Sequence, residues 1–263
     1  MEKAILITRI SELDRIESDV DRIYFGHEFC ERRLPNSEEL LNVINWCKKN
    51  EKPMTLLTPP IKETGLGYLE SLFPIAAQSG ICEEVCINDW GALRLMAQMK
   101  LRLKPILGRL LVKLKRDPRI LLMKKKLPSP ALDHFSRANV DTPEMAGFLR
   151  DLGIHRVEMD NVLQGINREG DVLQASIYFP WAYVSTTFLC LTAGSARNSR
   201  PHSRSIFPCE KECLHSSFSL QHQHMPETLI MKGNTYFFET KKLPFDLESN
   251  MIDRIVYEPE IPF

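Results

Sequence analysis

The sequence lacks three features that would have narrowed its role at once: net charge, a long apolar run and a targeting segment. Lys and Arg together number 34, equal to Asp and Glu, so no global field draws the chain to nucleic acid or membrane. No stretch approaches the roughly 18 apolar residues of a membrane span. The N-terminus has neither the apolar region nor the cleavage site of a signal peptide. We therefore expect a soluble cytoplasmic protein.

Several catalytic and nucleotide-binding motifs are also missing. No GxGxxG or Walker motif follows any apolar run, which argues against an open nucleotide-binding sheet. HExxH and GxSxG are absent as well, so peptidase chemistry has no motif behind it. A hydrolase would have to use another nucleophile, for which Cys30 beside His27 is one candidate.

What the chain does have is a regular alternation of short β-rich runs and amphipathic helical segments. The runs are 4–8, 21–25, 53–57, 83–87, 104–108, 155–159 and 175–179, and the clearest helices are 36–50, 89–100 and 141–153. Strands that alternate with helices indicate βαβ units and a parallel sheet. At 263 residues this predicts a single α/β domain over 1–263, a TIM-like (β/α) barrel that is complete or distorted.

Two segments interrupt this rhythm. Residues 109–139 form a long basic connection, and residues 191–227 form a polar, irregular loop that contains cysteines. Loops of this length inside a compact domain are usually functional or disordered. Residues 228–239 then predict a β-hairpin, followed by a short C-terminal tail.

The seven cysteines are an odd count in a protein expected to stay reduced, so they do not form a disulfide framework. Cys47 lies on the apolar face of a predicted helix, and Cys82 and Cys86 flank a predicted strand. Each of these three fits a small buried hydrophobic residue. Cys209 and Cys213 instead lie four apart in a polar loop, close enough to share one centre.

Two further cysteines complete a candidate ligand set. Cys190 ends a strand-like run, and Cys30 follows a strand at what would be the carboxyl rim of the barrel. Four thiolates could bind zinc or an iron–sulfur cluster, and spacing alone leaves both open. Basic residues in the same loop could offset the thiolate charge: Arg197, Arg200, Arg204 and Lys211.

The segment IYFGHEFCERR (23–33) resembles the strand–Gly–x–x–x–Cys element of the collagenase-like peptidase (U32) family. INDWG (87–91), the segment from Thr186 to Cys213 and the hairpin at 228–239 are similar to the elements that follow in its UbiV-type iron–sulfur branch. The resemblance implies a barrel-like fold and a 4Fe–4S cluster held by Cys30, Cys190, Cys209 and Cys213. The loop between Cys190 and Cys209 is longer here, which leaves His202 or His215 as an alternative ligand.

The same resemblance implies a function. UbiV-type proteins work beside a related UbiU-like partner in hydroxylating a prenylated aromatic quinone precursor without dioxygen. Other relatives hydroxylate RNA bases, and the family was named for proteolysis, so an RNA-base hydroxylation factor and a peptidase are the alternatives. The RNA alternative depends on the basic run 113–126, which could bind phosphates but equally fits a solvated face.

Catalytic groups of a barrel belong at the carboxyl ends of its strands. Candidates for moving protons there are His27, Glu28, Asp89 and Glu158, with Arg109 a candidate for binding an acidic oxygen donor. Asn88 and Asp160 occupy similar positions. Each has a structural alternative: a cap on the next helix for Asp89, and an ion pair with Arg32 or Arg33 for Glu28.

Overall fold

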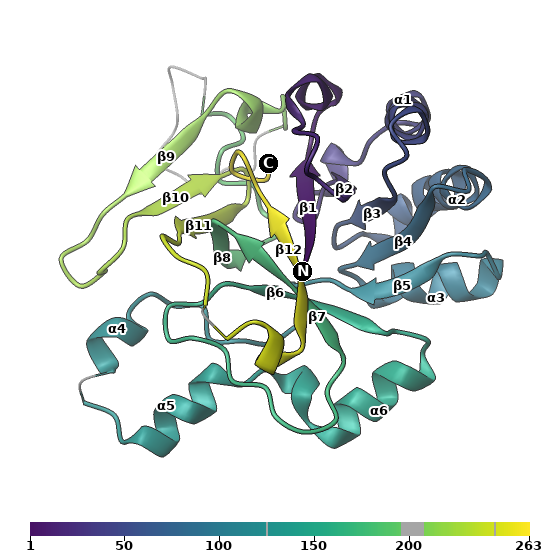
Figure 1. Cartoon of the computed structure of the whole chain (residues 1–263). Helices are drawn as coiled ribbons and strands as arrows, with labels where there is room; N and C mark the ends of the chain where they lie inside the picture. Colours follow the sequence, from purple (N-terminus) through teal and green to yellow (C-terminus); the bar gives the residue numbers. More distant parts are fainter. Residues whose placement is uncertain (125, 196–207, 245) are drawn as a thin grey trace.

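The computed structural model describes residues 1–124, 126–195, 208–244 and 246–263. Its centre is a closed barrel of parallel strands in the order β1-β12-β7-β6-β5-β4-β3-β2 (Figure 1). The barrel strands are β1 (Glu2–Ile7), β2 (Arg22–Gly26), β3 (Met54–Thr58), β4 (Cys82–Ile87), β5 (Lys104–Leu107), β6 (Arg156–Asp160), β7 (Gln174–Phe179) and β12 (Ile252–Tyr257). The predicted α/β barrel is confirmed, and it is closed rather than incomplete.

Helices cover the outside of the strands. They are α1 (Ser37–Lys49), α2 (Glu63–Gln78), α3 (Trp90–Met99), α4 (Ile120–Met123), α5 (Ser129–Ser136) and α6 (Pro143–Asp151). The three predicted helices correspond to α1, α3 and α6. Asn36 begins α1 with a reciprocal capping box with Glu39, and Thr142 caps α6 by accepting from the Met145 N–H at 3.3 Å. The helix α2 was not among the predicted elements.

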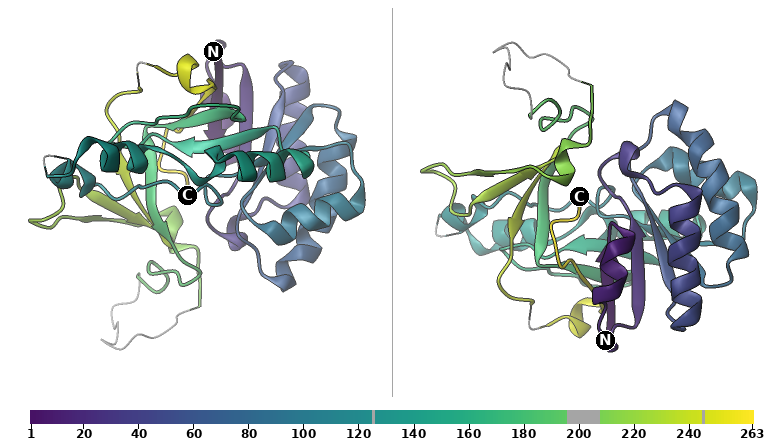
Figure 2. Two further views of the ribbon diagram at one scale, coloured as in Figure 1. Left: turned by 90° about the horizontal axis from the view of Figure 1, so that it is seen from below. Right: turned by 90° about the horizontal axis from the view of Figure 1, so that it is seen from above.

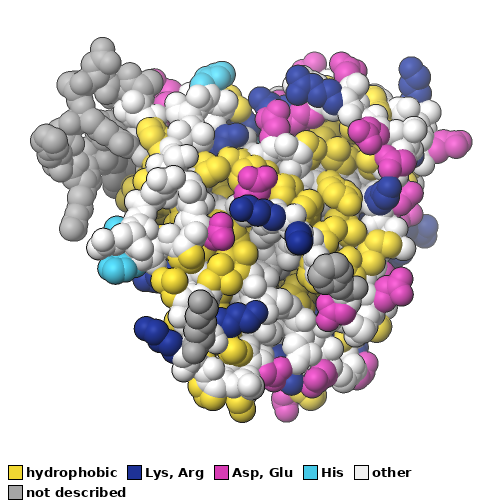
Figure 3. Space-filling view, turned by 60° about the vertical axis from the view of Figure 1, so that its left-hand side comes forward, with side chains coloured by type: hydrophobic (Ala, Val, Ile, Leu, Met, Phe, Trp, Pro, Cys, Tyr) yellow, Lys and Arg dark blue, Asp and Glu magenta, His cyan; other side chains and the backbone are white. Residues whose placement is uncertain are grey.

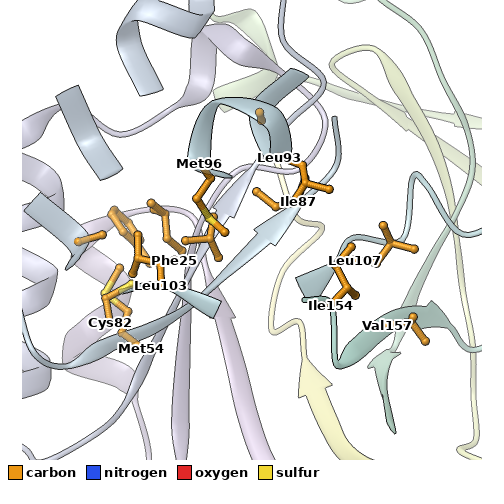
Figure 4. Close-up of a cluster of buried hydrophobic side chains, with 14 of the residues drawn as sticks. Phe25, Met54, Cys82, Ile87, Leu93, Met96, Leu103, Leu107, Ile154 and Val157 are labelled. Atoms are coloured by element: carbon orange, nitrogen blue, oxygen red, sulfur yellow. The ribbon is translucent and has the colours of Figure 1, made fainter. Parts of the chain in front are cut away.

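The main core lies between the barrel strands and the surrounding helices. Figure 4 shows Phe25, Met54 and Cys82 packed with side chains of α3 such as Met96. A second apolar cluster fills the barrel interior. Cys47, Cys82 and Cys86 are all buried in these clusters, as their positions in the predicted elements indicated.

The predicted C-terminal tail is wrong in one respect, because it supplies the eighth barrel strand. Strand β12 pairs in parallel with β1 on one side and β7 on the other. Charged residues interrupt its apolar pattern and hid it in the sequence. Arg254 is buried, and its guanidinium donates to Glu84 Oε2 at 2.7 Å, so the charge is neutralised within the barrel.

A second sheet lies beside the barrel, on the side away from α1, α2 and α3 (Figures 1 and 2). It contains β8 (Trp181–Thr186), β9 (Ser217–Leu220), β10 (Leu229–Lys232) and β11 (Thr235–Glu239), paired antiparallel in the order β8-β11-β10-β9. The predicted hairpin is β10–β11. The segment 191–227, predicted as irregular, also contains β9 and a short 3-10 helix, Glu212–Leu214.

The basic connection 109–139 is partly ordered by buried contacts. Arg116, within the basic run, is 8% exposed and donates to Asp160 Oδ2 at 2.6 Å and to the carbonyls of Arg109 and Val112. This guanidinium is therefore not displayed on a solvated face. Arg119, by contrast, forms an exposed pair with Asp117.

Candidate functional site

Four cysteines from three separate segments line one pocket of about 310 Å³. Cys30 follows β2, Cys190 follows β8, and Cys209 and Cys213 precede β9. Cys213 is buried, and the other three are partly exposed. The pocket therefore lies at the carboxyl end of the barrel, where the first strands meet the second sheet, and the four residues predicted as ligands meet there.

Asn234, in the turn between β10 and β11, holds two of these segments together. Its side-chain amide donates to the carbonyl of Phe29 at 2.9 Å and to the carbonyl of Thr187. One side chain thus joins the residue before Cys30 to the segment that leads into Cys190. The adjacent Gly233 has φ +62, and a Cβ there would lie 2.0 Å from the Phe263 ring, so only glycine fits this turn.

Glu212 joins the segment that carries Cys209 and Cys213 to the segment that carries Cys190. Its carboxylate, 8% exposed, accepts from the Gly194 N–H at 2.5 Å and from the Glu210 N–H at 3.1 Å. The residue immediately before Cys213 is therefore fixed to the chain just after Cys190. Hydrogen bonds from backbone N–H groups to a buried carboxylate are among the stronger ones in proteins.

The thiols influence one another. Burial, partly opposed by Arg33 and reinforced by the thiols of Cys190, Cys30 and Cys209, raises the pKa of the Cys213 thiol to about 11. Burial also raises the pKa of Cys30, and the neighbouring thiolates at Cys190 and Cys209 act in the same direction. Four negative thiolates would repel one another unless a cation lay between them. The donor set thus suits a positively charged inorganic centre.

The rest of the pocket wall combines cations with apolar surface. Its charged side chains include Arg32, Arg33, Lys62 and Glu31, and Lys62 Nζ lies 3.6 Å from Glu31 Oε1. Its apolar walls include Phe29, Phe188, Leu189 and Phe263. Lys62 Nζ lies 5.8 Å from the centre of the Phe188 ring.

Among the described residues, His215 is not on this wall, and no three His, Cys, Asp or Glu side chains are grouped as one metal ion requires. His202, Arg197, Arg200 and Arg204 lie outside the described residues.

Three predicted catalytic residues meet instead in a buried ion cluster at the end of the barrel. Arg109 is 0% exposed and binds Glu28 at 2.7 Å, Asp160 at 3.1 Å and Glu258 at 2.6 Å. Its guanidinium also lies 3.9 Å from the centre of the Tyr178 ring. Glu28 therefore pairs with Arg109, and the expectation that it pairs with Arg32 or Arg33 is not met.

The remaining predicted residues lie apart from this cluster. Asp89 caps α3 by accepting from the N–H groups of Gly91 and Ala92, at 2.7 and 3.1 Å. Asn88 joins two loops through the Thr58 carbonyl and the Leu110 N–H. Glu158 is enclosed in the barrel, where burial raises its pKa to about 7. His27 is 4% exposed and belongs to a smaller, neighbouring pocket.

The sequence predicted no role at this site for four residues that organise it: Glu258, Arg116, Asn234 and Glu212. Burial raises the pKa of Glu258 to about 8 although Arg109 opposes the shift. Glu258 was missed because β12 was missed. Arg116 was hidden in a run of basic residues, and the other two act only through contacts that are remote in sequence.

Fold and site together define a (β/α) barrel with a cysteine-lined pocket at its carboxyl rim. Among solved structures, the U32 peptidase Mk0906 aligns over 99% of this chain and 93% of its own, with a TM-score of 0.50 and 12% identity. At this identity the likeness shows a shared fold alone. The chain thus has the fold of a U32 peptidase.

Other comparisons add no functional information. A glycoside hydrolase family 18 N-acetylglucosaminidase from Paenibacillus barengoltzii aligns over 97% of this chain and 94% of its own, at 8% identity and a TM-score of 0.37. That likeness is too slight to support an argument. No protein-family model matches the sequence, and no curated protein matches it.

The face of the molecule drawn in Figure 3 carries charged side chains of both signs. On the face in Figure 3, basic and acidic side chains are interspersed with apolar ones. None of the helices within the described ranges is long and apolar enough to cross a membrane.

Proposed function

We propose that this protein holds a 4Fe–4S cluster on Cys30, Cys190, Cys209 and Cys213. The observation that carries the proposal is the meeting of these four thiols in one pocket, from segments up to 183 residues apart in the chain. Cysteine thiolates in sets of four are the usual ligands of such clusters. The U32-type fold and the resemblance of the cysteine elements to the UbiV-type branch support the same assignment.

Zinc in the same site is the competing possibility. Four sulfurs around one zinc at about 2.3 Å must group tightly, whereas a cluster distributes its thiolates over separate iron atoms. A pocket of about 310 Å³ has room for the larger centre. Arg32, Arg33 and Lys62 on the wall would offset the negative charge of the liganded thiolates.

We infer further that the protein is a component of an oxygen-independent hydroxylation system for a prenylated aromatic quinone precursor. When bound, the cluster would supply or accept electrons. The chain's own contribution is a wall of aromatic and aliphatic side chains, Phe29, Phe188, Leu189 and Phe263, which suits an apolar ring better than a peptide. A UbiU-like partner is expected on the basis of the resemblance alone.

Anaerobic purification followed by iron, sulfide and zinc analysis tests the cluster. The wild type should carry about four iron and four sulfide per chain, and Cys213→Ala should lose most of both. Cys47→Ala is the matched control, since Cys47 is a buried thiol in the α1 core, and it should retain full iron. Stoichiometric zinc in place of iron in the anaerobic wild type would replace the cluster assignment with the zinc alternative.

The hydroxylation role needs its own test. Cell extracts from an anaerobic strain without this protein should accumulate the unhydroxylated quinone precursor, and the wild-type gene should restore the product. Cys213→Ala should fail to restore it, whereas Cys47→Ala should succeed. Normal quinone levels in the deleted strain would overturn the assigned substrate while leaving the cluster untouched.

A further inference from the structure

A second pocket, of about 150 Å³, lies next to the cysteine pocket at the carboxyl ends of β1 and β2. Arg33 lines both pockets, so the two cavities share a wall. The volume is several times what one water molecule requires. The smaller pocket holds no cysteine, and its wall includes His27, Arg33, Lys211 and Arg9. Its chemistry therefore differs from that of the thiol pocket.

His27 is the most enclosed polar side chain of this wall. It is 4% exposed, and its Nε2 has no hydrogen-bond partner among the described residues. A buried polar atom without a partner costs free energy. Burial lowers the pKa of His27 well below its usual value, and Arg33, Lys232 and Lys211 act in the same direction. The ring is thus a neutral group in a positive environment.

Arg33 and Lys211 supply positive charge to this wall, although Arg33 also faces the cysteine pocket. Arg33 Nε is buried without a hydrogen-bond partner, and neither side chain forms an ion pair within the described parts of the chain. Lys211 adopts a left-handed backbone conformation with φ +60, which is unusual for a residue other than glycine. Residues held in such conformations occur preferentially at functional sites.

The acidic residue on the wall, Glu39, and Glu12 just beside the wall are both already engaged. Glu12 accepts from the N–H groups of Thr8 and Arg9 and pairs with the Arg9 guanidinium. Glu39 accepts from the Asn36 N–H in the capping box of α1. Arg9 is neutralised by Glu12 and by Glu260 at 2.5 Å. What remains is an excess of positive charge at Arg33 and Lys211 beside an imidazole whose Nε2 has no partner among the described residues.

We propose that this pocket binds a compact oxyanion, the carboxylate or phosphate group of a small ligand, between Arg33, Lys211 and His27. Charge-assisted hydrogen bonds from a guanidinium and an ammonium to an oxyanion are strong and specific. His27 lies on the same wall and contributes a neutral imidazole to it. This site does not depend on the cluster, although Arg33 and Lys211 lie on the segments that carry Cys30 and the Cys209–Cys213 pair.

Isothermal titration calorimetry on the full-length, anaerobically purified protein tests the site, with inorganic phosphate and malonate as separate probes at constant ionic strength. We expect one saturable site for at least one of the two probes, and the better probe distinguishes phosphate from carboxylate. Arg33→Gln and Lys211→Gln should each weaken binding by about tenfold or more, the usual effect of losing a charged hydrogen-bond partner.

Arg32→Gln is the matched control, because it removes the same charge one residue away and lines only the cysteine pocket. It should leave the affinity of the probe within about twofold. If Arg33→Gln fails to fold, Lys211→Gln decides, since Lys211 is exposed. No saturable binding of either probe up to about 10 mM, or an equal loss with Arg32→Gln, would overturn the oxyanion site.

Discussion

The axis of the barrel and the pocket at its rim differ in what their polar side chains contact. At the axis, Arg109 is fully enclosed and meets three carboxylates, so its charge is neutralised within the protein. At the rim, four thiols and several cations face a cavity of about 310 Å³. The first arrangement is held by ion pairs within the protein, whereas the second faces open space.

This difference shows where to look for chemistry on the present barrel. Barrel enzymes usually act over the axis, at the carboxyl ends of the strands. Here Arg109, Glu28, Asp160 and Glu258 fill that position with ion pairs, and Tyr178 and Phe29 pack against the guanidinium. The space for a ligand is displaced toward β2 and the second sheet. The candidate reactive residues therefore lie on loops beside the second sheet rather than over the barrel axis.

Removing the central charge of the axis should have the largest effect. Arg109→Met would leave Glu28, Asp160 and Glu258 buried with Arg116 as their remaining close cation, and breaking such a pair typically costs 3–5 kcal/mol. We expect urea denaturation to show at least that loss, or a protein that does not fold. Arg150→Met, which breaks an exposed pair with Asp171, should change stability by less than about 1 kcal/mol. Similar stability losses in both variants would show that the axis is not a closed ion cluster.

The second prediction concerns the buried carboxyl inside the barrel. Burial raises the pKa of Glu158 to about 7, and Arg254 and Arg156 only partly oppose this. The native state therefore keeps a proton that the unfolded state releases above pH 4.5, and this group lowers stability as pH rises toward 7. Glu158→Gln should remove that slope and gain up to about 3 kcal/mol relative to wild type by pH 8.

Denaturation midpoints of the two proteins between pH 5 and 8 provide the measurement for Glu158. Glutamine keeps an oxygen that can accept from the hydroxyls of Tyr24 and Ser176, which lie 3.1 and 3.0 Å from the carboxylate. The stability difference between variant and wild type should therefore grow with pH. Parallel curves would mean that Glu158 is ionised in the folded protein throughout this range.

At the rim, the side chain that joins the cysteine segments should matter for both stability and ligand content. Asn234→Ala removes the hydrogen bonds to the Phe29 and Thr187 carbonyls, which should cost about 1–3 kcal/mol. The iron content of anaerobic preparations should fall as well, because Cys30 and Cys190 lose their common anchor. Asn42→Ala, on the exposed face of α1, should change stability by no more than about 0.5 kcal/mol. Unchanged iron with lowered stability would restrict Asn234 to a purely structural role.

The sequence could predict those features of the axis and the rim that depend on residues close together in the chain. Strands such as β3, buried throughout, stand out as apolar runs, so most of the barrel was found. Strand β12 was missed because Asp253 and Arg254 interrupt its pattern, and the partner that neutralises Arg254 lies 170 residues away. Local sequence patterns do not reveal such pairings between distant residues.

The residues of the candidate site likewise include some that a local sequence pattern reveals and some that only distant contacts reveal. Cysteines in a polar loop are conspicuous, which is why Cys209 and Cys213 attracted attention before their partners were placed. Asn234 reaches Phe29 across 205 residues, and nothing in its own neighbourhood indicates this. The acid–base candidates were chosen by their place after strands, and this rule cannot separate residues that face a ligand from those that close the core. Glu28 and Arg109 belong to the second kind.

The smallest predicted effect tests one of those candidates directly. Asp89 caps α3 through two backbone N–H groups, so Asp89→Ala should lose about 1 kcal/mol. Asparagine is an equally good capping residue but cannot carry a proton, so Asp89→Asn should remain within a few tenths of a kcal/mol of wild type. Urea denaturation of both variants, with quinone formation in anaerobic cells, separates the two roles. If Asp89→Asn keeps its stability yet abolishes the product, the carboxyl of Asp89 acts in the reaction. Asp89 would then belong with the reactive residues at the rim rather than with the structural ones.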